Sequence, residues 1–195
     1  MVLLAGGAGP YTLLSIAGFE LLPFFSTAEA LTLRLVCREF QGAVATFPWL
    51  DTATAIKHLA LWRACFPAAR GARIVRRSEH SDADFVHLSG LHTLLMSGCS
   101  QATITDAAFS HLRGIHTLNM SACSQITITD AAFEHLRGIH TLRMSGCTQD
   151  TITSAAFAPL RGIHTLDIWG CCQMGISDAA FAIPAWYPHA GHEPL

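Results

Sequence analysis

Cysteine and histidine recur at a fixed spacing in the second half of the chain, and both side chains bind metal ions in proteins. Two series share this spacing: Cys99, Cys123, Cys147 and Cys171, and His92, His116, His140 and His164. Zinc binding would need such residues to converge on one point, whereas duplication of a unit produces stacked ladders. We expect ladders, with the cysteines pointing inward and the histidines on or beside strands, and therefore no metal and no cofactor.

The sequence contains no other pattern that is typical of catalysis. Paired carboxylates and a nucleophile elbow are not found, and the glycine-rich segment at residues 6–9 does not follow a strand, as a phosphate-binding loop would. We therefore expect no catalytic residues. Neighbouring imidazoles about 5 Å apart would repel each other once protonated near their usual pKa of about 6.5, which predicts mild acid sensitivity below pH 6.

An internal repeat explains both series. Four related segments end at Met96, Met120, Met144 and Ile168, each 24 positions after the one before. A half unit at residues 82–88 precedes the first of them. Repeats of this length stack, because a single unit cannot bury its own apolar side.

Each unit predicts one short strand and one short helix. In the second unit, the two-residue spacing of Leu118 and Met120 places both side chains on one face of a strand. Phe133 and Leu136 have helical spacing, and Thr129 or Asp130 is suited to cap the helix. Stacking of four or five such units predicts an α/β solenoid with a parallel sheet.

Residues 81–183 resemble the cysteine-containing class of leucine-rich repeats, with a consensus of L-x-x-L-x-L-x-x-C followed by I-T-D. The units differ from that class by two extra residues after the cysteine and by the lack of a C-P pair. The resemblance implies a short leucine-rich-repeat arc that binds another protein.

The exposed side of the predicted strands is where the units have diverged. Successive units carry Leu95, Asn119, Arg143 and Asp167 at one position, and Ser97, Ser121, Ser145 and Trp169 at another. Arginine and tryptophan are frequent in binding hot spots. We therefore predict that Leu95, Asn119, Arg143, Asp167 and Trp169 bind a target protein; neutral drift on a solvated face is the alternative.

The first half predicts a small cluster of helices at residues 13–50. Ser26 or Thr27 precedes Glu29 as in a capped helix start. A helical stripe of apolar residues follows, formed by Leu31, Leu35, Val36, Phe40 and Val44. Residues 51–80, where Ile56, Leu59, Ala60 and Trp62 have helical spacing, are expected to be a linker and solenoid cap, with a degenerate first strand at Ile74 and Val75.

The segment LRLVCREF at residues 33–40, preceded by Phe24 and Phe25, resembles an F-box, a small all-α domain. The resemblance covers about residues 13–50, and residues 1–12 and 184–195 are expected to be tails. It implies binding to a Skp-type adaptor through a set of apolar residues: Ile16, Leu21, Leu22, Phe24, Leu31, Leu35, Val36 and Phe40.

The order of F-box, linker and repeats is similar to that of substrate receptors in Skp/cullin/F-box ubiquitin ligases. That similarity implies a non-catalytic subunit whose partners are a Skp-type adaptor with its cullin complex and an unknown target protein. It also implies a location in the cytoplasm or nucleus, which would be those of the host cell if the source is viral. The alternative is a stand-alone protein-binding module. With 12 Lys and Arg against 14 Asp and Glu, nucleic acid is not an expected partner. Glycine and proline interrupt the apolar residues 1–25, so neither a signal peptide nor a membrane span is expected.

Overall fold

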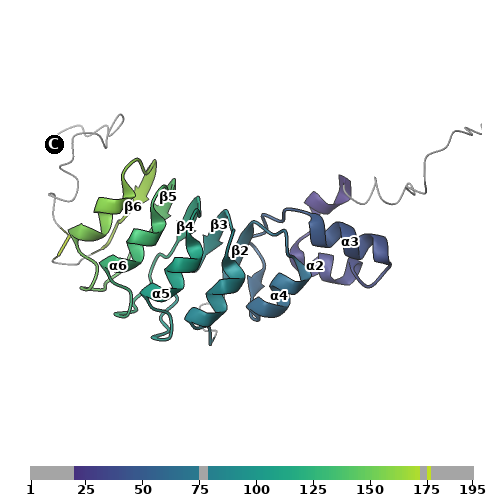
Figure 1. Ribbon diagram of the computed structural model, residues 1–195, viewed down its shortest axis with the longest axis horizontal. Coiled ribbons are helices and arrows are strands. Elements are labelled where there is room, and N and C mark those ends of the chain that lie inside the picture. Colours follow the sequence, from purple (N-terminus) through teal and green to yellow (C-terminus); the bar gives the residue numbers. More distant parts are fainter. Residues whose placement is uncertain (1–19, 75–78, 172–174, 177–195) are drawn as a thin grey trace, which may run out of the picture.

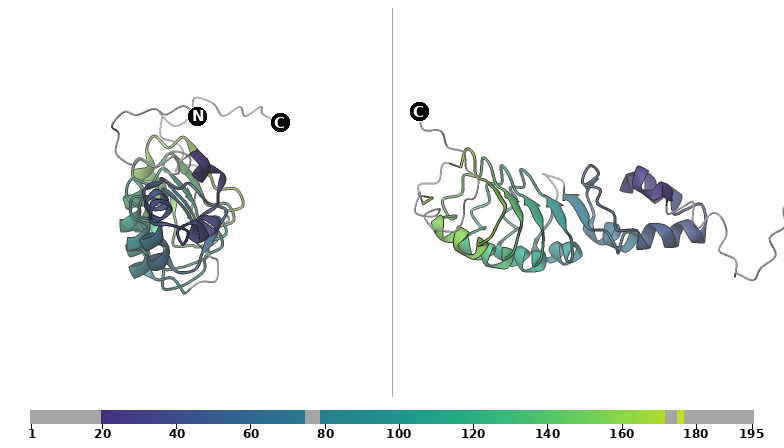
Figure 2. Two further views of the ribbon diagram at one scale, coloured as in Figure 1. Left: turned by 90° about the vertical axis from the view of Figure 1, so that its right-hand side faces the viewer. Right: turned by 90° about the horizontal axis from the view of Figure 1, so that it is seen from above.

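The computed structural model describes residues 20–74, 79–171 and 175–176. Figure 1 shows a curved row of coils, each with a strand on one side and a helix on the other, with a small group of helices at the N-terminal end. Seen from above in Figure 2, the helices lie along one side of the row and the strands along the other. The α/β solenoid that the repeats predict is confirmed.

Six strands form one parallel sheet, in the order in which they occur in the sequence. In the repeat region, each strand residue is paired with the residue 24 positions further on, as Leu94 is with Leu118 and Leu118 with Leu142. The strands are β1 (Ala55–Ile56), β2 (Gly71–Ile74), β3 (Thr93–Leu95), β4 (Thr117–Asn119), β5 (Thr141–Arg143) and β6 (Thr165–Asp167). A constant register stacks equivalent side chains into columns along the solenoid.

Short helices cover the other side of each coil. They are α4 (Leu59–Cys65), η2 (Asp82–Leu88), α5 (Asp106–Phe109), η3 (Ser110–Leu112), α6 (Asp130–Phe133), η4 (Glu134–Leu136) and η5 (Ser154–Leu160). Thr129 is the N-cap of α6, and its hydroxyl accepts a hydrogen bond from the Ala131 backbone. This confirms the capping prediction, with Asp130 in the first turn instead of at the cap.

The N-terminal segment of the solenoid differs from the prediction at one residue. Ile56 was expected to share a helix with Leu59 and Trp62, but it lies in β1, where it pairs with Ile74. Only α4 follows the helical spacing. Because β1 has two residues, no alternation is long enough to indicate a strand in the sequence.

The helical end consists of η1 (Leu22–Phe24), α2 (Thr27–Leu33) and α3 (Arg38–Thr46), after residues 20 and 21, which are also helical. The predicted start of α2 is confirmed, because Ser26 and Glu29 form a reciprocal capping box. The predicted single stripe is wrong, since the chain turns at residues 34–37 between α2 and α3. Leu35 and Val36 therefore lie in the turn and not on a helix face shared with Val44.

Buried contacts join the helical end to the solenoid. Trp49 is buried, its indole N–H donates to the Val44 carbonyl at 2.8 Å, and its ring packs edge-on against Phe66. The Trp49 carbonyl also accepts hydrogen bonds from the backbones of Arg70 and Gly71. A Cβ on Gly71 would lie 2.7 Å from the Leu50 carbonyl carbon, so only glycine fits this close approach.

Candidate functional site

The exposed face of the sheet carries the predicted target-binding row. Leu95, Asn119, Arg143 and Asp167 occupy matching positions of β3 to β6, so the structure brings all four side by side. Their strand neighbours at positions 94, 118 and 142 are fully buried, which confirms the alternation of the strands. Parallel strands are about 4.8 Å apart, so the row spans roughly 15 Å.

Hydrogen bonds hold part of this row in place. The Asn119 side-chain oxygen accepts from the Ser97 hydroxyl at 2.8 Å and from the Ser121 backbone at 3.0 Å. The Ser145 hydroxyl donates to that of Ser121 at 3.1 Å. The amide is thus fixed on a polar surface, which suits specific hydrogen bonding more than apolar contact.

The C-terminal end of the row is charged and aromatic. Asp167 accepts a hydrogen bond from the Trp169 backbone at 3.1 Å, and the Trp169 side chain is 84% exposed. Arg143 neighbours Asp167 in the sheet, yet the described residues contain no ion pair between them. An exposed indole beside two opposite charges is a suitable place for a partner protein to bind.

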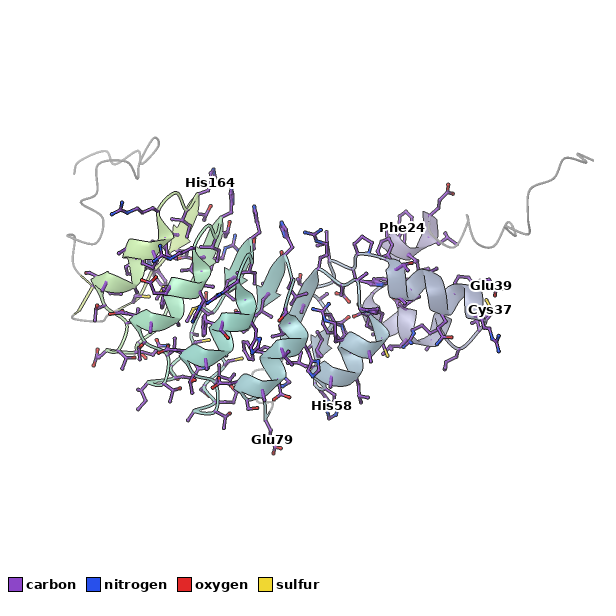
Figure 3. All side chains as sticks on the ribbon, viewed as in Figure 1. Phe24, Cys37, Glu39, His58, Glu79 and His164 are labelled. Carbon is purple, nitrogen blue, oxygen red and sulfur yellow. The ribbon has the colours of Figure 1, made fainter. Side chains whose placement is uncertain are left out.

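The helical end carries a second concentration of exposed groups. Ten large apolar side chains of the described residues are exposed, and six of them lie between residues 21 and 50: Leu21, Phe24, Leu31, Leu35, Val36 and Leu50. Leu35 and Phe24 are the most open of these six, at 87% and 82%. Figure 3 shows Phe24 and Cys37, the residue after Val36, at the end of the molecule away from the repeats.

Five of the eight residues predicted to bind an adaptor are therefore on the surface. Leu22 is completely buried in the core, so the prediction that it contacts an adaptor is wrong. Leu22 is the first residue of η1, and it belongs to the same buried core cluster as Ala30 of α2 and Val44 of α3. Phe40 is half-buried. Ile16 lies outside the described residues, as do Val75 and the tails at 1–12 and 184–195.

The cysteine ladder is part of the core. Cys99, Cys123 and Cys147 are completely buried, and the thiols of Cys123 and Cys147 donate to the carbonyls of Met96 and Met120 in the preceding coil. Burial raises the pKa of both thiols to about 12. A buried, protonated thiol that is already hydrogen-bonded is a structural group and not a nucleophile.

The histidine ladder lies at the start of the strands. The rings of His92, His116, His140 and His164 stack with centroids 4.4 to 4.5 Å apart. Figure 3 shows the last of them, His164, at the edge of the solenoid. Partial burial and the charges of its two neighbours lower the pKa of His140. Within the described residues, no group of three or more His, Cys, Asp or Glu side chains is arranged to hold a metal ion.

Sequence reasoning missed two ladders. In the first, an aspartate of each coil bonds to a threonine of the next: Asp106 accepts from both the backbone and the hydroxyl of Thr129 at 2.7 Å, and Asp130 does the same for Thr153. The second consists of exposed arginines at the turn from helix to strand: Arg113, Arg137 and Arg161. The recurring R-G-I-H segment was the available signal for the arginines.

Comparisons with known proteins concern the fold alone. No family model and no curated protein matches the sequence. Two similar solved structures are a TLR13–ssRNA13 complex, with 18% identity and a TM-score of 0.48, and the Toll–Spatzle complex of Drosophila, with 10% identity and a TM-score of 0.35. The similarity covers 66% and 68% of this chain but only 21% and 24% of those chains. None of the described helices is long and apolar enough to span a membrane.

Proposed function

We propose that this protein is a non-catalytic receptor subunit whose repeats bind a target protein and whose helical end binds a Skp-type adaptor of a cullin ubiquitin ligase. It would act in the cytoplasm or nucleus, without a metal or cofactor. The ligase would modify the target because the receptor holds the two proteins close together.

The main support is the distribution of exposed apolar side chains. Six of the ten that are exposed in the described residues belong to the segment at 21–50, although this segment has a buried anchor in Trp49. Large apolar side chains gathered on a small surface indicate a protein-binding site. Their place at the end opposite the repeats leaves the sheet face free for a second partner.

The sheet face supports the target-binding part of the proposal. It is built on short strands whose register is fixed, so the groups at positions 95, 119, 143 and 167 are held in a defined row. Rigid presentation lowers the entropic cost of binding. The stand-alone module, in which the helical end only caps the solenoid, shares this face but needs no adaptor.

A pull-down with a purified Skp adaptor separates the two functions. We expect the full-length protein to bind and the double variant Leu35→Asp, Val36→Asp to lose binding by tenfold or more, because two charges would have to be buried. The matched control is Ile126→Asp, which changes a side chain that is 73% exposed on a repeat loop. Equal behaviour of the two variants, or no binding by the wild type, would leave only the stand-alone module.

A further inference from the structure

Basic side chains line the turn from helix to strand in three consecutive coils. We call Arg113, His135, Arg137 and Arg161 the turn edge. Arg113 donates a hydrogen bond to Nδ1 of His135 at 3.3 Å, which links the first two coils. Arg137 and Arg161 line one open pocket of about 450 Å³ together with Pro159 and its neighbours. The edge is therefore continuous across the coils.

One carboxylate within the chain shows how an acid binds to this edge. Glu134 forms an ion pair with Arg137, three residues later. This is the one salt bridge among the described residues. Both side chains are exposed, and the pair sits at the wall of the pocket. The arginine of this turn is thus oriented to receive a carboxylate from the side of the helix.

The next coil lacks that carboxylate. Ala158 occupies the position equivalent to Glu134, and Arg161 forms no hydrogen bond or ion pair within the described part of the chain. The backbone has the same shape at both arginines, with φ and ψ of −54° and 130° at Arg137 and −56° and 131° at Arg161. The two turns thus differ in charge and not in shape.

We propose that Arg161, in the pocket that it lines together with Arg137, binds a carboxylate of a partner protein, and that the turn edge as a whole is a docking surface for an acidic peptide segment. The incoming carboxylate takes the place that Glu134 takes at Arg137. This proposal rests on the repeats binding a protein, as proposed above, but not on the adaptor. The surface is separate from the row on the exposed face of the sheet.

An acidic peptide fits this edge better than a nucleic acid does. The three arginines and their histidine present carboxylate-binding groups, but none of the described exposed aromatic side chains, on which a base could stack, lies on the edge. The chain as a whole has a net charge of −2, so it does not carry the broad excess of positive charge that is typical of proteins that bind a nucleic-acid backbone. A short acidic segment needs only the local positive charge of the turn edge.

The test is a fluorescence anisotropy titration of the full-length protein with fluorescein-labelled octaglutamate at 50 mM salt. Arg161→Gln and Ala158→Glu should each weaken binding about three- to fivefold, the second by forming the internal ion pair that this coil lacks. Glu134→Gln should strengthen binding about twofold, because Arg137 becomes free. The charge-matched controls Arg38→Gln, at the exposed start of α3, and Ala107→Glu, exposed on α5, should change affinity by less than twofold.

Each outcome decides the proposal. Weaker binding of octaglutamate to both Arg161→Gln and Ala158→Glu, with unchanged affinity in the control variants, supports the proposal. No binding of octaglutamate, equal effects in pocket and control variants, or tighter binding of a labelled octathymidylate would overturn it. The adaptor pull-down repeated with Ala158→Glu keeps the two proposals apart. If the wild type binds the adaptor but not octaglutamate, the proposal for the turn edge fails and the ligase role stands. If the wild type binds octaglutamate but not the adaptor, the ligase role fails and the turn edge stands.

Discussion

The backbone at Ala122 is strained, and the repeats supply the means to test it. The loop after each of the strands β3 to β6 contains a residue with positive φ: Gly98 at 70°, Gly146 at 69° and Gly170 at 70°, but Ala122 at 56° after β4. The Ala122 N–H donates to the Ser145 carbonyl at 2.8 Å, so the loop cannot change shape without losing a hydrogen bond. An L-residue with a Cβ is destabilised in this conformation.

We expect Ala122→Gly to stabilise the protein. Relief of the left-handed conformation is worth about 1–2 kcal/mol. The greater freedom of glycine in the unfolded chain offsets about 0.4–1 kcal/mol of this. The net gain is therefore about 0.5–1 kcal/mol. For a chain of this length, that corresponds to a rise in melting temperature of about 1–4 °C.

Urea denaturation followed by circular dichroism measures the effect, and two further glycine positions serve as controls. Gly146→Ala should destabilise by a similar amount, because a Cβ there meets no atom within 4 Å and only the φ is unfavourable. Gly42→Ala should stabilise, since this residue is in α3, has no positive φ and has free space around it. A destabilised Ala122→Gly, or a neutral Gly146→Ala, would refute the reasoning.

Three further predictions concern the ladders. Asp106→Ala should lower the free energy of unfolding in urea by about 2 kcal/mol, because two charge-assisted hydrogen bonds to the next coil are lost. A loss smaller than about 0.5 kcal/mol, the least expected for a single hydrogen bond, would contradict this. Partial burial and neighbouring imidazoles lower the pKa of His140 in the folded state, so the unfolded chain binds more protons as pH falls below about 6.5. The melting temperature of the wild type should therefore decrease between pH 7.5 and 5.5, and that of His140→Asn should decrease less. An equal decrease in the two proteins would show that the histidine ladder does not cause the acid sensitivity. Iodoacetamide at pH 8 should modify Cys37 before Cys123, whose pKa is about 12, as peptide mass spectrometry would show; equal rates would argue against the buried thiol.

The repeats were predictable from the sequence because their constant period is compatible with only one way of stacking the coils. Identical spacing in all four units fixes which side chains stack, and Leu118 and Met120 inside the sheet follow directly from the two-residue alternation. The stacked imidazoles follow from the same periodicity. Their ring centroids are 4.4 to 4.5 Å apart, which is slightly less than the distance of about 4.8 Å between neighbouring strands. Here the local pattern and the tertiary packing agree.

The helical end was less predictable because contacts distant in sequence determine it. Leu22 has the same apolar character as Leu21, yet Leu22 is buried in the core cluster and Leu21 is exposed, and residue type alone does not distinguish the two. Asp51 also acts across the sequence. Burial raises its pKa, but hydrogen bonds from Thr54 and from Thr27 at the start of α2 outweigh this and lower it. No spacing within residues 20–50 indicates this link.

The arginines of the turn edge show how a repeated residue can differ in its surroundings between coils. Arg113, Arg137 and Arg161 look equivalent in the sequence, and duplication alone would explain them. Their surroundings are not equivalent: the first donates to His135, the second has Glu134, and the third faces Ala158. The arginine that is paired with a carboxylate in one turn is thus left without a charged partner among the described residues in the next, where we propose that it binds a carboxylate of another protein. In such a solenoid, the sites to test are therefore the coils where a repeated charge has lost its repeated counter-charge.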